Sequence, residues 1–387
     1  MDKLKAIVVG AGMGGLTAGI ALQQAGYKVE IYDRVSELRP AGAGISLWSN
    51  GVKVLNQLGL GPEIAKIGGP MRRMAYRRYT GEPLTDFSLS PLVEAVGQSP
   101  YPVTRTDLQQ MLLDRLGTET LQLKSHCIAV EQDQTSATAI FEDGRRATGD
   151  LVVGADGTHS IIRRHVLGET VERRYVGYVN WNGLVSATED LAPVHTWTTF
   201  VGESKRASMM PVGGDRFYFF FDVPLPKGTE SQKEQYREEL QGYFKGWAKP
   251  VQTLIERLDP LQTNRVEIHD IEPLSTLATG RIVLLGDSGH STAPDLGQGG
   301  CQALEDAFVL CRCLLTTNIS VADALKRYEA ERQERTANII LGARKRSNMT
   351  HGKELEKTQQ WYEELAHEDG TKVLRAITDN ILAGPLH

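Results

Sequence analysis

KAIVVGAGMGGLTAGIALQQAGYKVEIYD, residues 5–33, is the stretch that decides the fold. It opens with a short β-branched strand, KAIVV, and continues through GAGMGG, a G-x-G-x-x-G motif at Gly10, Gly12 and Gly15. The following LTAGIALQQAG has apolar residues at helical spacing, and KVEIYD alternates as a second strand. A glycine motif between a strand and a helix, followed by a strand that ends in an acid, predicts a dinucleotide-binding Rossmann unit.

Each position of this motif has a physical role in holding a pyrophosphate. Gly10 permits the tight turn, Gly12 lets the phosphates approach the backbone, and Gly15 lets the helix pack closely on the strand. Free N–H groups and a partial positive charge at the start of the helix attract phosphates. Asp33, which ends the second strand, is expected to accept hydrogen bonds from a ribose. The predicted cofactor contacts here are Gly12, Gly14, Gly15, Asp33 and Arg34.

The composition is that of an ordinary globular protein with room for two closely packed domains. The chain has 387 residues, of which 41% are hydrophobic and 24% charged, and its formal net charge is −5. Its densest basic run, RRMAYRR at 72–78, is expected to be a solvated strand edge, and no basic stripe indicates nucleic-acid binding. We find no signal peptide and no apolar run of about 18 residues, which predicts a cytoplasmic protein that does not bind a membrane.

The cysteines do not indicate a disulfide framework or a metal centre. Cys127, Cys301, Cys311 and Cys313 are few and scattered. Cys311 and Cys313 lie two residues apart on an expected helix, so they point to different faces, and no histidine or cysteine completes a ligand set. We therefore expect structural cysteines and no metal.

Two further glycine-rich segments follow apolar strands. GDLVVGADGTHSIIRR, residues 149–164, places Asp156 directly after the strand LVV. GDSGHSTAPDLGQGG, residues 286–300, lies between the expected strand RIVLL and a helix expected to begin near Gly299. Glycine costs conformational entropy in such a position, so we expect a ligand to approach the bare backbone.

The three motifs, taken in order, resemble the signatures of the class A flavoprotein monooxygenases. The first signature is G-x-G-x-x-G near the N-terminus, the second is G-A-D-G-x-x-S-x-x-R, and the late one is G-D-x-x-H-x-x-x-P-x-x-G-Q-G. The resemblance covers nearly all of the sequence. It implies an α/β fold of the para-hydroxybenzoate hydroxylase type: a Rossmann-type FAD-binding domain, an antiparallel β-sheet substrate domain and C-terminal helices.

The expected domains are discontinuous in the sequence. The FAD-binding domain comprises residues 1–70, 101–172 and 266–345, the substrate-binding β-sheet domain comprises 71–100 and 173–265, and 346–387 form a C-terminal helical segment.

Local patterns place elements within these domains. A helix is expected to begin at Arg105 with Thr104 or Thr106 as its N-cap. LQLKSHCIAVEQ and SATAIFEDGR are expected to pair as a hairpin. Residues 173–225 predict four or five antiparallel strands, and residues 230–260 are amphipathic and helical.

The resemblance implies that the late motif holds FAD from the other side of the Rossmann unit. Asp287 is expected to bind the ribityl chain, and the loop 297–301 to run beside the isoalloxazine. The helix near Gly299 would direct its positive end at the flavin N1–C2=O edge and stabilise the reduced anion. The implied contacts are Ser46, Arg105, Cys127, Asp287, Gly297, Gln298, Gly299, Gly300 and Cys301.

Some of these assignments are more specific. Arg105 is expected to reach the phosphates or the ribityl chain, and Cys127 to make a backbone contact with adenine. Cys301 stands where many members have Asn, so we expect a backbone N–H contact and no redox role. Asp156 is expected to brace the FAD fold, and His290 to be structural or to face the flavin. No second G-x-G-x-x-G unit is present, so NADH is expected to bind transiently against the FAD domain.

Shorter strings resemble the urate hydroxylases within this family, namely YVNWNGLV, TWTTFVGE-x-KR, GDRFYFFFDVPLP, HDIEP and TAPDLGQGGC. This resemblance implies FAD-dependent hydroxylation of urate to 5-hydroxyisourate with NADH and O2, through a C4a-hydroperoxyflavin, in purine catabolism. Urate is an anion with several donors and acceptors, so its site needs a cation and polar groups within an apolar shell.

Four polar residues are the candidates for that site. Arg206 is expected to neutralise and orient the anion, and Asn180 to pair with a ring carbonyl and N–H. Tyr218 is expected to orient the substrate or to hold Arg206, and Asp295 to act as a base or to position water. Without the resemblance, a strand arginine is more often a surface charge and such a tyrosine more often core.

Two other functions stay open at the level of sequence. A hydroxylase of another small aromatic anion, such as salicylate or hydroxybenzoate, would share the FAD residues and differ in the substrate pocket. A flavin redox protein without oxygenation is the alternative from a different class. The residues do not determine the choice between NADH and NADPH, the motion of the flavin or the oligomeric state. A homo-oligomer therefore stays open.

Overall fold

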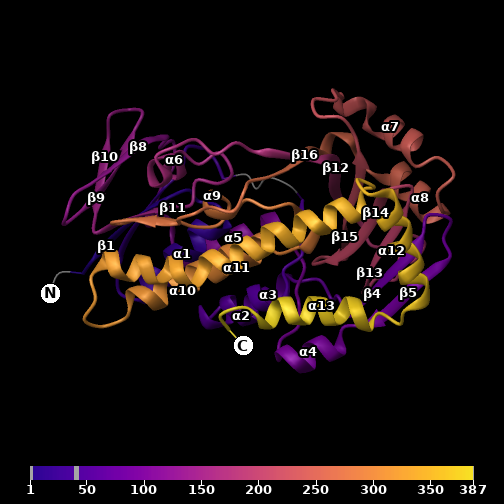
Figure 1. The fold of residues 1–387 in the computed structure, drawn as a ribbon, viewed down its shortest axis with the longest axis horizontal. Coiled ribbons are helices and arrows are strands. Elements are labelled where there is room, and N and C mark those ends of the chain that lie inside the picture. The colour runs from indigo at the N-terminus through magenta and orange to yellow at the C-terminus, as the bar shows by residue number, and fades with distance from the viewer. Residues whose placement is uncertain (1–2, 39–42, 387) are drawn as a thin grey trace.

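The computed structural model describes residues 3–38 and 43–386, which Figure 1 shows as a ribbon. One part of the molecule is built on a largely parallel sheet and the other on a large, largely antiparallel sheet. The long helix α11 (Val321–Thr350) runs from the first part to the second. Residues 39–42, at the start of the expected glycine-rich loop RPAGAG, lie outside the described part.

The first sheet confirms the predicted Rossmann unit. Its strands, in order across the sheet, are β17 (Ala278–Thr279), β18 (Ile282–Leu284), β11 (Leu151–Gly154), β1 (Lys5–Val9), β2 (Lys28–Tyr32) and β7 (Leu121–Gln122). β1 pairs in parallel with both β2 and β11, and β11 pairs in parallel with β18. The inner strands β1, β11 and β18 are continuous apolar runs because a parallel sheet is buried on both faces.

Helices from distant parts of the chain meet on this sheet. α1 (Met13–Gln24) packs on β1 and β2 and lies against α5 (Arg105–Leu116) and α10 (Gly299–Leu314). The hydroxyl of Thr104 accepts a hydrogen bond from the Asp107 amide at 3.1 Å and so caps α5. Of the two candidate caps, Thr104 is therefore confirmed.

A small antiparallel sheet of β8 (Cys127–Gln132), β9 (Ala137–Phe141) and β10 (Arg146–Gly149) precedes the middle glycine motif. The predicted hairpin is confirmed for β8 and β9. Its first strand is shorter than predicted, because Leu121 and Gln122 form β7 and pair with β2 at the edge of the Rossmann sheet.

The second sheet has seven strands. Their order is β16 (Asn264–Asp270), β12 (Arg174–Ser186), β15 (Arg216–Pro224), β14 (Lys205–Val212), β13 (Thr196–Gly202), β4 (Arg73–Arg78) and β5 (Pro83–Ser88). Neighbouring strands are antiparallel except β13 and β4, which are parallel. Residues 173–225 thus supply four strands, as predicted.

The basic run at 72–78 is not the solvated edge that its sequence indicates. β4 lies between β13 and β5, and β5 forms the edge. Met74, Ala75 and Tyr76, between the arginines, are buried. The prediction was wrong because it considered only the local density of charge. Burial of the apolar side chains between the arginines stabilises an inner position for this strand.

The two faces of the second sheet differ because side chains alternate along each strand. One face carries Trp181, Phe219 and Phe221 and is covered by α7 (Tyr236–Tyr243) and α8 (Lys249–Arg257). The other face is polar. Its polar side chains include Tyr178, Asn180, Asn182, Arg206, Tyr218 and Asp222.

The chain continues after α11 through α12 (Leu355–His367) and α13 (Thr371–Leu382). α12 packs beside β5, and α13 contacts α2 (Ser49–Gln57) and α4 (Ser90–Val96) (Figure 1). Lys53 on α2 donates a hydrogen bond to the carbonyl of Leu386 at 2.8 Å. The last described residues therefore lie against the N-terminal part of the molecule.

Short elements complete the fold. They are β3 (Gly44–Ile45), α3 (Gly61–Ile67), β6 (Val103–Thr104), α6 (Ile161–Leu167), α9 (Asp287–His290) and the 3-10 turns η1 (Thr118–Thr120), η2 (Lys233–Gln235), η3 (Pro260–Gln262) and η4 (Pro294–Leu296). Among residues 3–38 and 43–386, no helix combines the length and the apolar character needed to cross a membrane. The domain boundaries proposed from the sequence stay predictions.

Replacing Gly15 by alanine tests the close approach of α1 to β1. A Cβ at Gly15 would lie 1.9 Å from the carbonyl oxygen of Gly10, so the backbone would have to move. We expect Gly15→Ala to lose about 3 kcal/mol of unfolding free energy in urea titrations, as for a strongly overpacked core. The control is Gly242→Ala on α7, where no described atom lies within 4 Å of the added Cβ. Equal unfolding midpoints for the two variants would contradict this account.

Candidate functional site

The turn between β1 and α1 has the geometry that its motif predicts. Gly10 has a φ of +109°, which glycine adopts without strain, and its amide donates to the carbonyl of Tyr32 at 2.7 Å. Asp33 Oδ2 accepts a hydrogen bond from the Ala11 amide at 2.7 Å. The acid at the end of β2 is therefore fixed against the turn, and its contact with a ribose stays a prediction.

The start of α1 is open to a ligand. Gly12 is the N-cap and makes no side-chain capping bond, and a Cβ built there would have no described atom within 4 Å. No side chain caps the first N–H groups of the helix, and the space beside Gly12 is open, as an anion site requires. Gly14 differs, because its Cβ would lie 2.6 Å from Leu285 Cδ2. The structure thus gives Gly14 a packing role, and its cofactor contact stays a prediction.

The turn at Gly286 directs Asp287 outward. Gly286 has a φ of +65°, and Asp287 is exposed although the residues around it are buried. The Gly286 amide donates to Asp306 Oδ2 on α10 at 2.8 Å, which fixes the turn from behind. The carboxylate of Asp287 is accessible to a hydroxyl-bearing ligand, as its predicted contact with a ribityl chain requires.

The middle motif braces this turn. Arg163 on α6 donates to the carbonyl of Ser288 at 3.1 Å. Asp156 in turn accepts hydrogen bonds from the Ser160 hydroxyl at 2.6 Å and the Ile161 amide at 2.8 Å, which orders the start of α6. The bracing role expected for Asp156 is consistent with these contacts.

A buried ion-pair network lies beneath both late loops. Arg332 of α11 is 1% exposed and contacts Asp306 at 2.6 Å and Glu305 at 2.7 Å. His290 Nε2 lies 2.5 Å from Asp306, so His290 is structural. Burial would raise the pKa of Asp306, but His290 and Arg332 lower it below its usual range. We call Arg332, Glu305, Asp306 and His290 the Arg332 cluster.

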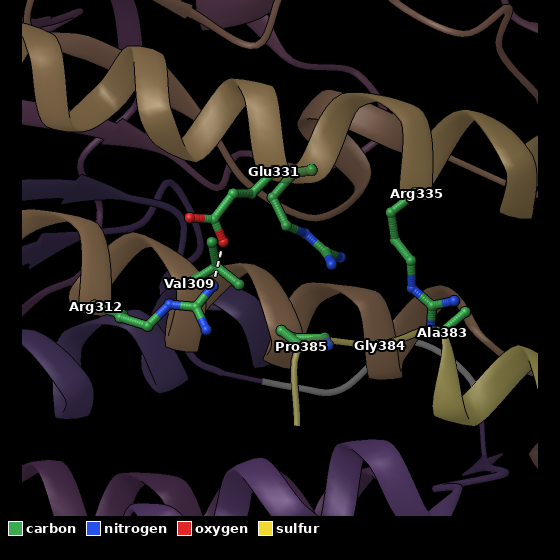
Figure 2. A pocket seen from close by; sticks show the side chains of 8 residues that line it. Val309, Arg312, Glu331, Arg335, Ala383, Gly384 and Pro385 are labelled. Carbon is green, nitrogen blue, oxygen red and sulfur yellow. Dashed lines mark hydrogen bonds and ion pairs between the residues drawn. The ribbon is translucent and has the colours of Figure 1, made fainter. Parts of the chain in front are cut away.

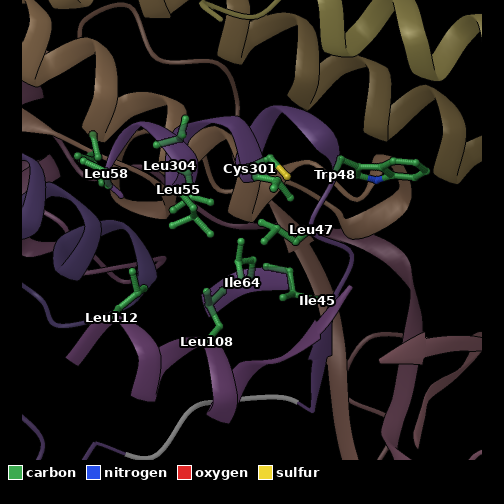
Figure 3. Packing of buried hydrophobic residues seen from close by; sticks show 14 of the residues in the cluster. Ile45, Leu47, Trp48, Leu55, Leu58, Ile64, Leu108, Leu112, Cys301 and Leu304 are labelled. Carbon is green, nitrogen blue, oxygen red and sulfur yellow. The ribbon is translucent and has the colours of Figure 1, made fainter. Parts of the chain in front are cut away.

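The loop 297–301 passes over a tightly packed core, which Figure 3 shows around Ile45 and Cys301. Gly297 has a φ of +63°, and its Cβ would lie 2.5 Å from Ser46 Oγ. A Cβ at Gly300 would lie 2.3 Å from Ile45 Cδ1. Burial raises the pKa of the Cys301 thiol to about 12, so the thiol is protonated at neutral pH and suits packing.

The side-chain oxygen of Gln298 is directed toward other residues of the protein. Its Oε1 accepts hydrogen bonds from Asn50 Nδ2 at 2.9 Å and from Gln302 Nε2 at 3.1 Å. The side-chain oxygen of Gln298 is therefore engaged within the protein, and its predicted cofactor contact stays a prediction. Asn50 also donates to Glu305 at 2.6 Å, which connects the loop to the Arg332 cluster.

The other predicted cofactor residues differ in exposure. Arg105 is the first residue of α5. A cation at the positive end of a helix dipole is unfavourable, so helix stability does not explain an arginine at this position. Arg34 is exposed. Cys127 is buried at the start of β8, and burial raises its thiol pKa to about 11. Their ligand contacts, like those of Ser46 and Gly299, stay predictions.

A second set of polar residues lies on the polar face of the second sheet. Arg206 donates from Nε to Asp222 Oδ2 at 2.8 Å and from Nη2 to Asp295 Oδ1 at 2.9 Å. Asn180 Nδ2 donates to Asp222 Oδ1 at 2.6 Å, and the Tyr178 hydroxyl donates to Asp295 Oδ2 at 2.8 Å. The structure therefore brings together the predicted residues Asn180, Arg206 and Asp295. We call Tyr178, Asn180, Arg206, Asp222 and Asp295 the polar cluster.

The charges of the polar cluster stabilise one another. Burial lowers the pKa of Arg206, but Asp222 and Asp295 outweigh burial and raise it above the ordinary value. Burial would likewise raise the pKa of Asp295, but Arg206 and His351, the C-cap of α11, lower it. Burial and the charge of Asp295 raise the pKa of Tyr178, which stays a donor. Arg206 and Asp295 are therefore ionised at neutral pH.

Tyr218 lies beside the polar cluster. A Cβ built at Gly44 would come within 2.5 Å of Tyr218 Cγ, so glycine lets the two segments meet. Burial raises the pKa of Tyr218 to about 12. The expected alternative that Tyr218 holds Arg206 is not seen, because among the described residues Arg206 is held by Asp222 and Asp295. An orienting role toward a substrate stays a prediction.

Three residues of this site were not predicted from the sequence, namely Tyr178, Asp222 and His351, the C-cap of α11. Asp222 had a usable signal, since it is an acid inside an apolar strand and shares the face of Tyr218. Tyr178 had a similar one, because it shares a face with Asn180. His351 had none, because only the path of α11 brings it to this sheet.

A cavity of about 380 Å³ lies elsewhere, between α10, α11 and the C-terminal segment (Figure 2). Arg312 in its wall pairs with Glu331, and Arg335 pairs with Glu305. Each of these arginines thus already has a carboxylate partner within the protein. Within the described part of the chain, no group of His, Cys, Asp and Glu is arranged to hold a metal ion.

Comparison with known proteins shows likeness over the full sequence. A family profile described as an FAD binding domain matches residues 3–343. The FAD-dependent urate hydroxylase of Klebsiella pneumoniae subsp. pneumoniae is 53% identical over 384 residues, covering 99% of this chain and 100% of the relative. That of Mycolicibacterium vanbaalenii is 49% identical, covering 99% and 98%. The crystal structure of Klebsiella pneumoniae HpxO complexed with FAD and uric acid matches with a TM-score of 0.97 at 52% identity, covering 99% and 98%.

Asp306→Asn tests the Arg332 cluster. The substitution leaves buried cations uncompensated, so we expect a loss of about 3 kcal/mol or more of unfolding free energy at neutral pH. Because the folded pKa of Asp306 lies below its unfolded value, its stabilisation is present at neutral pH and is lost as the pH falls through the folded pKa. Urea titrations should therefore show the gap to the wild type shrinking toward about pH 3.

The control for this measurement is Asp190→Asn, at an exposed ion pair with Arg257. It should leave the urea midpoint unchanged at both pH values. A gap between wild type and Asp306→Asn that does not depend on pH would contradict the ionised state assigned to Asp306.

Proposed function

Because the chain belongs to the FAD-binding domain family of flavoprotein monooxygenases, we propose that it is an FAD-dependent urate hydroxylase. It converts urate to 5-hydroxyisourate with NADH and dioxygen. The observation that carries this conclusion is the likeness to a protein solved with FAD and uric acid, which covers both chains almost entirely. The likeness therefore includes the polar face of the second sheet as well as the glycine loops.

The glycine loops fit FAD. The open start of α1 at Gly12 is suited to the pyrophosphate, Asp33 to a ribose, and the exposed carboxylate of Asp287 to the ribityl hydroxyls. The first turn of α10, at Gly299, has backbone amides that no side chain caps. When bound, the flavin accepts a hydride from NADH and activates dioxygen.

The polar cluster is the proposed substrate-recognition surface. Arg206 is a permanent cation that two carboxylates orient before a substrate arrives, so little side-chain freedom is lost on binding. Its planar donor edge suits a planar anion such as urate. Asn180 donates to Asp222 and accepts from Asn182 at 2.8 Å, which leaves one N–H and one lone pair for a purine edge.

We assign Asp295 a positioning role. Both of its oxygens are occupied, one by Arg206 and one by Tyr178. Its pKa is lowered from the ordinary value, and a base that works at neutral pH needs a pKa near that pH. Asp295 therefore orients Arg206 and nearby water more readily than it removes a proton. The cytoplasmic location stays a prediction.

The assay of this function uses the purified holoprotein in air. Urate and NADH should give NADH oxidation together with the transient absorbance of 5-hydroxyisourate. Salicylate and hydroxybenzoate in the same assay test the other aromatic anions, and NADPH in place of NADH tests the reductant. NADH oxidation without a hydroxylated product from any of these would favour a redox protein without oxygenation.

Arg206→Gln should keep bound FAD and lose productive hydroxylation. Without the guanidinium, two buried carboxylates face the urate anion, so we expect kcat/KM for urate to fall about 100-fold, as for the loss of a buried charge partner. NADH oxidation should become uncoupled from product formation. The control is Arg73→Gln on β4, which removes an exposed ion pair with Asp86 of β5. An unchanged ratio of product to NADH in Arg206→Gln would refute this role.

Asp287→Ala should weaken FAD retention. Loss of a charged acceptor of hydrogen bonds predicts an increase of about tenfold or more in the Kd for FAD, measured by flavin fluorescence after dialysis. Asp143→Ala, at an exposed pair with Arg145 on the small sheet, is the matched control. A variant at Asp287 that stays fully yellow through dialysis would count against the assignment.

A further inference from the structure

An arginine near the end of α11 is held between aromatic rings of two other elements. Arg346 is partly exposed, and its guanidinium carbon lies 4.3 Å from the centre of the Trp361 ring of α12, in a cation–π contact. Trp361 in turn packs edge-on against Tyr76 of β4, with the ring centroids 6.2 Å apart. The α12 ring therefore fixes the position of the Arg346 charge against β4.

The strand register places Tyr76 on the same face of the sheet as the polar cluster. Tyr76 pairs with Thr199 of β13, and the hydroxyl of Thr199 lies 2.9 Å from that of Ser208 on β14. Ser208 follows Arg206 by two residues and so shares its face. Neighbouring strands lie about 4.8 Å apart, so β4 lies about 10 Å across the sheet from β14. Arg346 is therefore anchored over the face that carries Arg206.

The end of α11 supports this placement from the other side of the polar cluster. The C-cap of the helix, His351, stacks on Tyr178 with the ring centroids 3.9 Å apart. Arg346 lies a little more than one helical turn before this contact. Burial lowers the pKa of Arg346, and the charges of Arg206 and Asp295 act on it in opposite directions, so both groups are near enough to interact with its charge.

Arg346 differs from Arg206 and Arg332 in having no carboxylate partner. Each of the other two contacts a pair of carboxylates. Among the residues that the structure describes, no carboxylate forms an ion pair with Arg346. An arginine is not deprotonated in proteins, and a charge removed from water without a partner is costly. The unpaired charge therefore indicates a partner that is not part of the protein.

The polar cluster by itself lacks the positive charge that an anion needs. It holds two carboxylates, those of Asp222 and Asp295, and one guanidinium, that of Arg206. Both carboxylates accept hydrogen bonds from Arg206, so its charge is already shared between them. Like charges repel strongly in a poorly solvated site. An anionic ring beside Arg206 therefore requires a further cation, and Arg346 is a permanent one.

On the basis of the proposed urate hydroxylation, we propose that Arg346 is a specificity-determining residue whose unpaired guanidinium gives the site the second positive charge that selects an anionic ring over an uncharged one. Trp361 holds this charge in place before the substrate arrives, so little side-chain freedom is lost on binding. Arg206 provides directed hydrogen bonds and Arg346 provides charge. Because the two tasks are divided, Arg206 can be held rigidly by two carboxylates without excluding an anion.

The test measures the Kd of the oxidised holoenzyme for two purines, from the change in flavin absorbance without NADH. At mildly acidic pH urate is an anion, whereas xanthine, the same purine without the 8-oxo group, is uncharged. Arg346→Met removes the charge and keeps an unbranched, adaptable side chain. We expect its Kd for urate to rise about tenfold or more, as for the loss of a close charge partner, and its Kd for xanthine to change less than about threefold. The Kd for FAD should stay that of the wild type.

Further variants separate charge from packing. Arg346→Lys keeps a cation and should retain most of the affinity for urate, whereas Arg346→Gln is polar and uncharged and should lose it as Arg346→Met does. Trp361→Leu changes the packing of α12 without removing a charge, so it should affect urate and xanthine alike. Arg375→Met, at an exposed pair with Asp379 on α13, should behave as wild type.

An unchanged Kd for urate in Arg346→Met, or equal losses of affinity for urate and xanthine, would overturn the proposal. If Arg346→Met does not retain FAD, or if the wild type does not bind xanthine, the comparison of Arg346→Lys with Arg346→Gln decides the question, and equal affinities of these two for urate would overturn it. Failure of the wild type to bind urate would instead contradict the proposed function, so the two conclusions fail by different results.

Discussion

The arrangement of the late loops depends on one buried guanidinium. Arg332 forms ion pairs with both Glu305 and Asp306, which are adjacent on α10, and Arg335 pairs with Glu305 as well. Two neighbouring carboxylates could not both stay ionised in the interior without such cations. Through Asp306 it fixes the turn before Asp287, and through Glu305 and its partner it fixes the loop at Gln298. A single side chain of α11 therefore holds two parts of the flavin site in register.

The same physical solution appears on the second sheet, where Arg206 lies between Asp222 and Asp295. In both places the desolvation cost of buried charge is offset only because each carboxylate has additional donors. The strand alternation of β12, β14 and β15 brings these polar groups to one face and leaves the aromatic residues to the other. This arrangement holds the donor edge of Arg206 rigid for recognition of a ligand.

Local patterns in the sequence predicted the parts of the fold that are determined locally. The G-x-G-x-x-G turn and the cap at Thr104 depend on backbone conformation and short-range hydrogen bonds, and both are as predicted. The burial of β4 could not be predicted, because it follows from parallel pairing with β13, far along the sequence. His351 could not be assigned for a similar reason, since only the length and direction of α11 bring it to Asp295. The side-chain direction of Gln298 depends on Asn50, another distant residue.

The strand order of the Rossmann sheet has a consequence for the synthesis of the protein. β1 is made first, but its neighbour β11 follows only at Leu151–Gly154, and β18, which pairs with β11, only at Ile282–Leu284. The ribosome must therefore release most of the polypeptide before this sheet can close. Until then β1 can pair with β2, but its other edge lacks β11 and is a candidate for chaperone binding. An N-terminal fragment expressed alone should accordingly be recovered as aggregate.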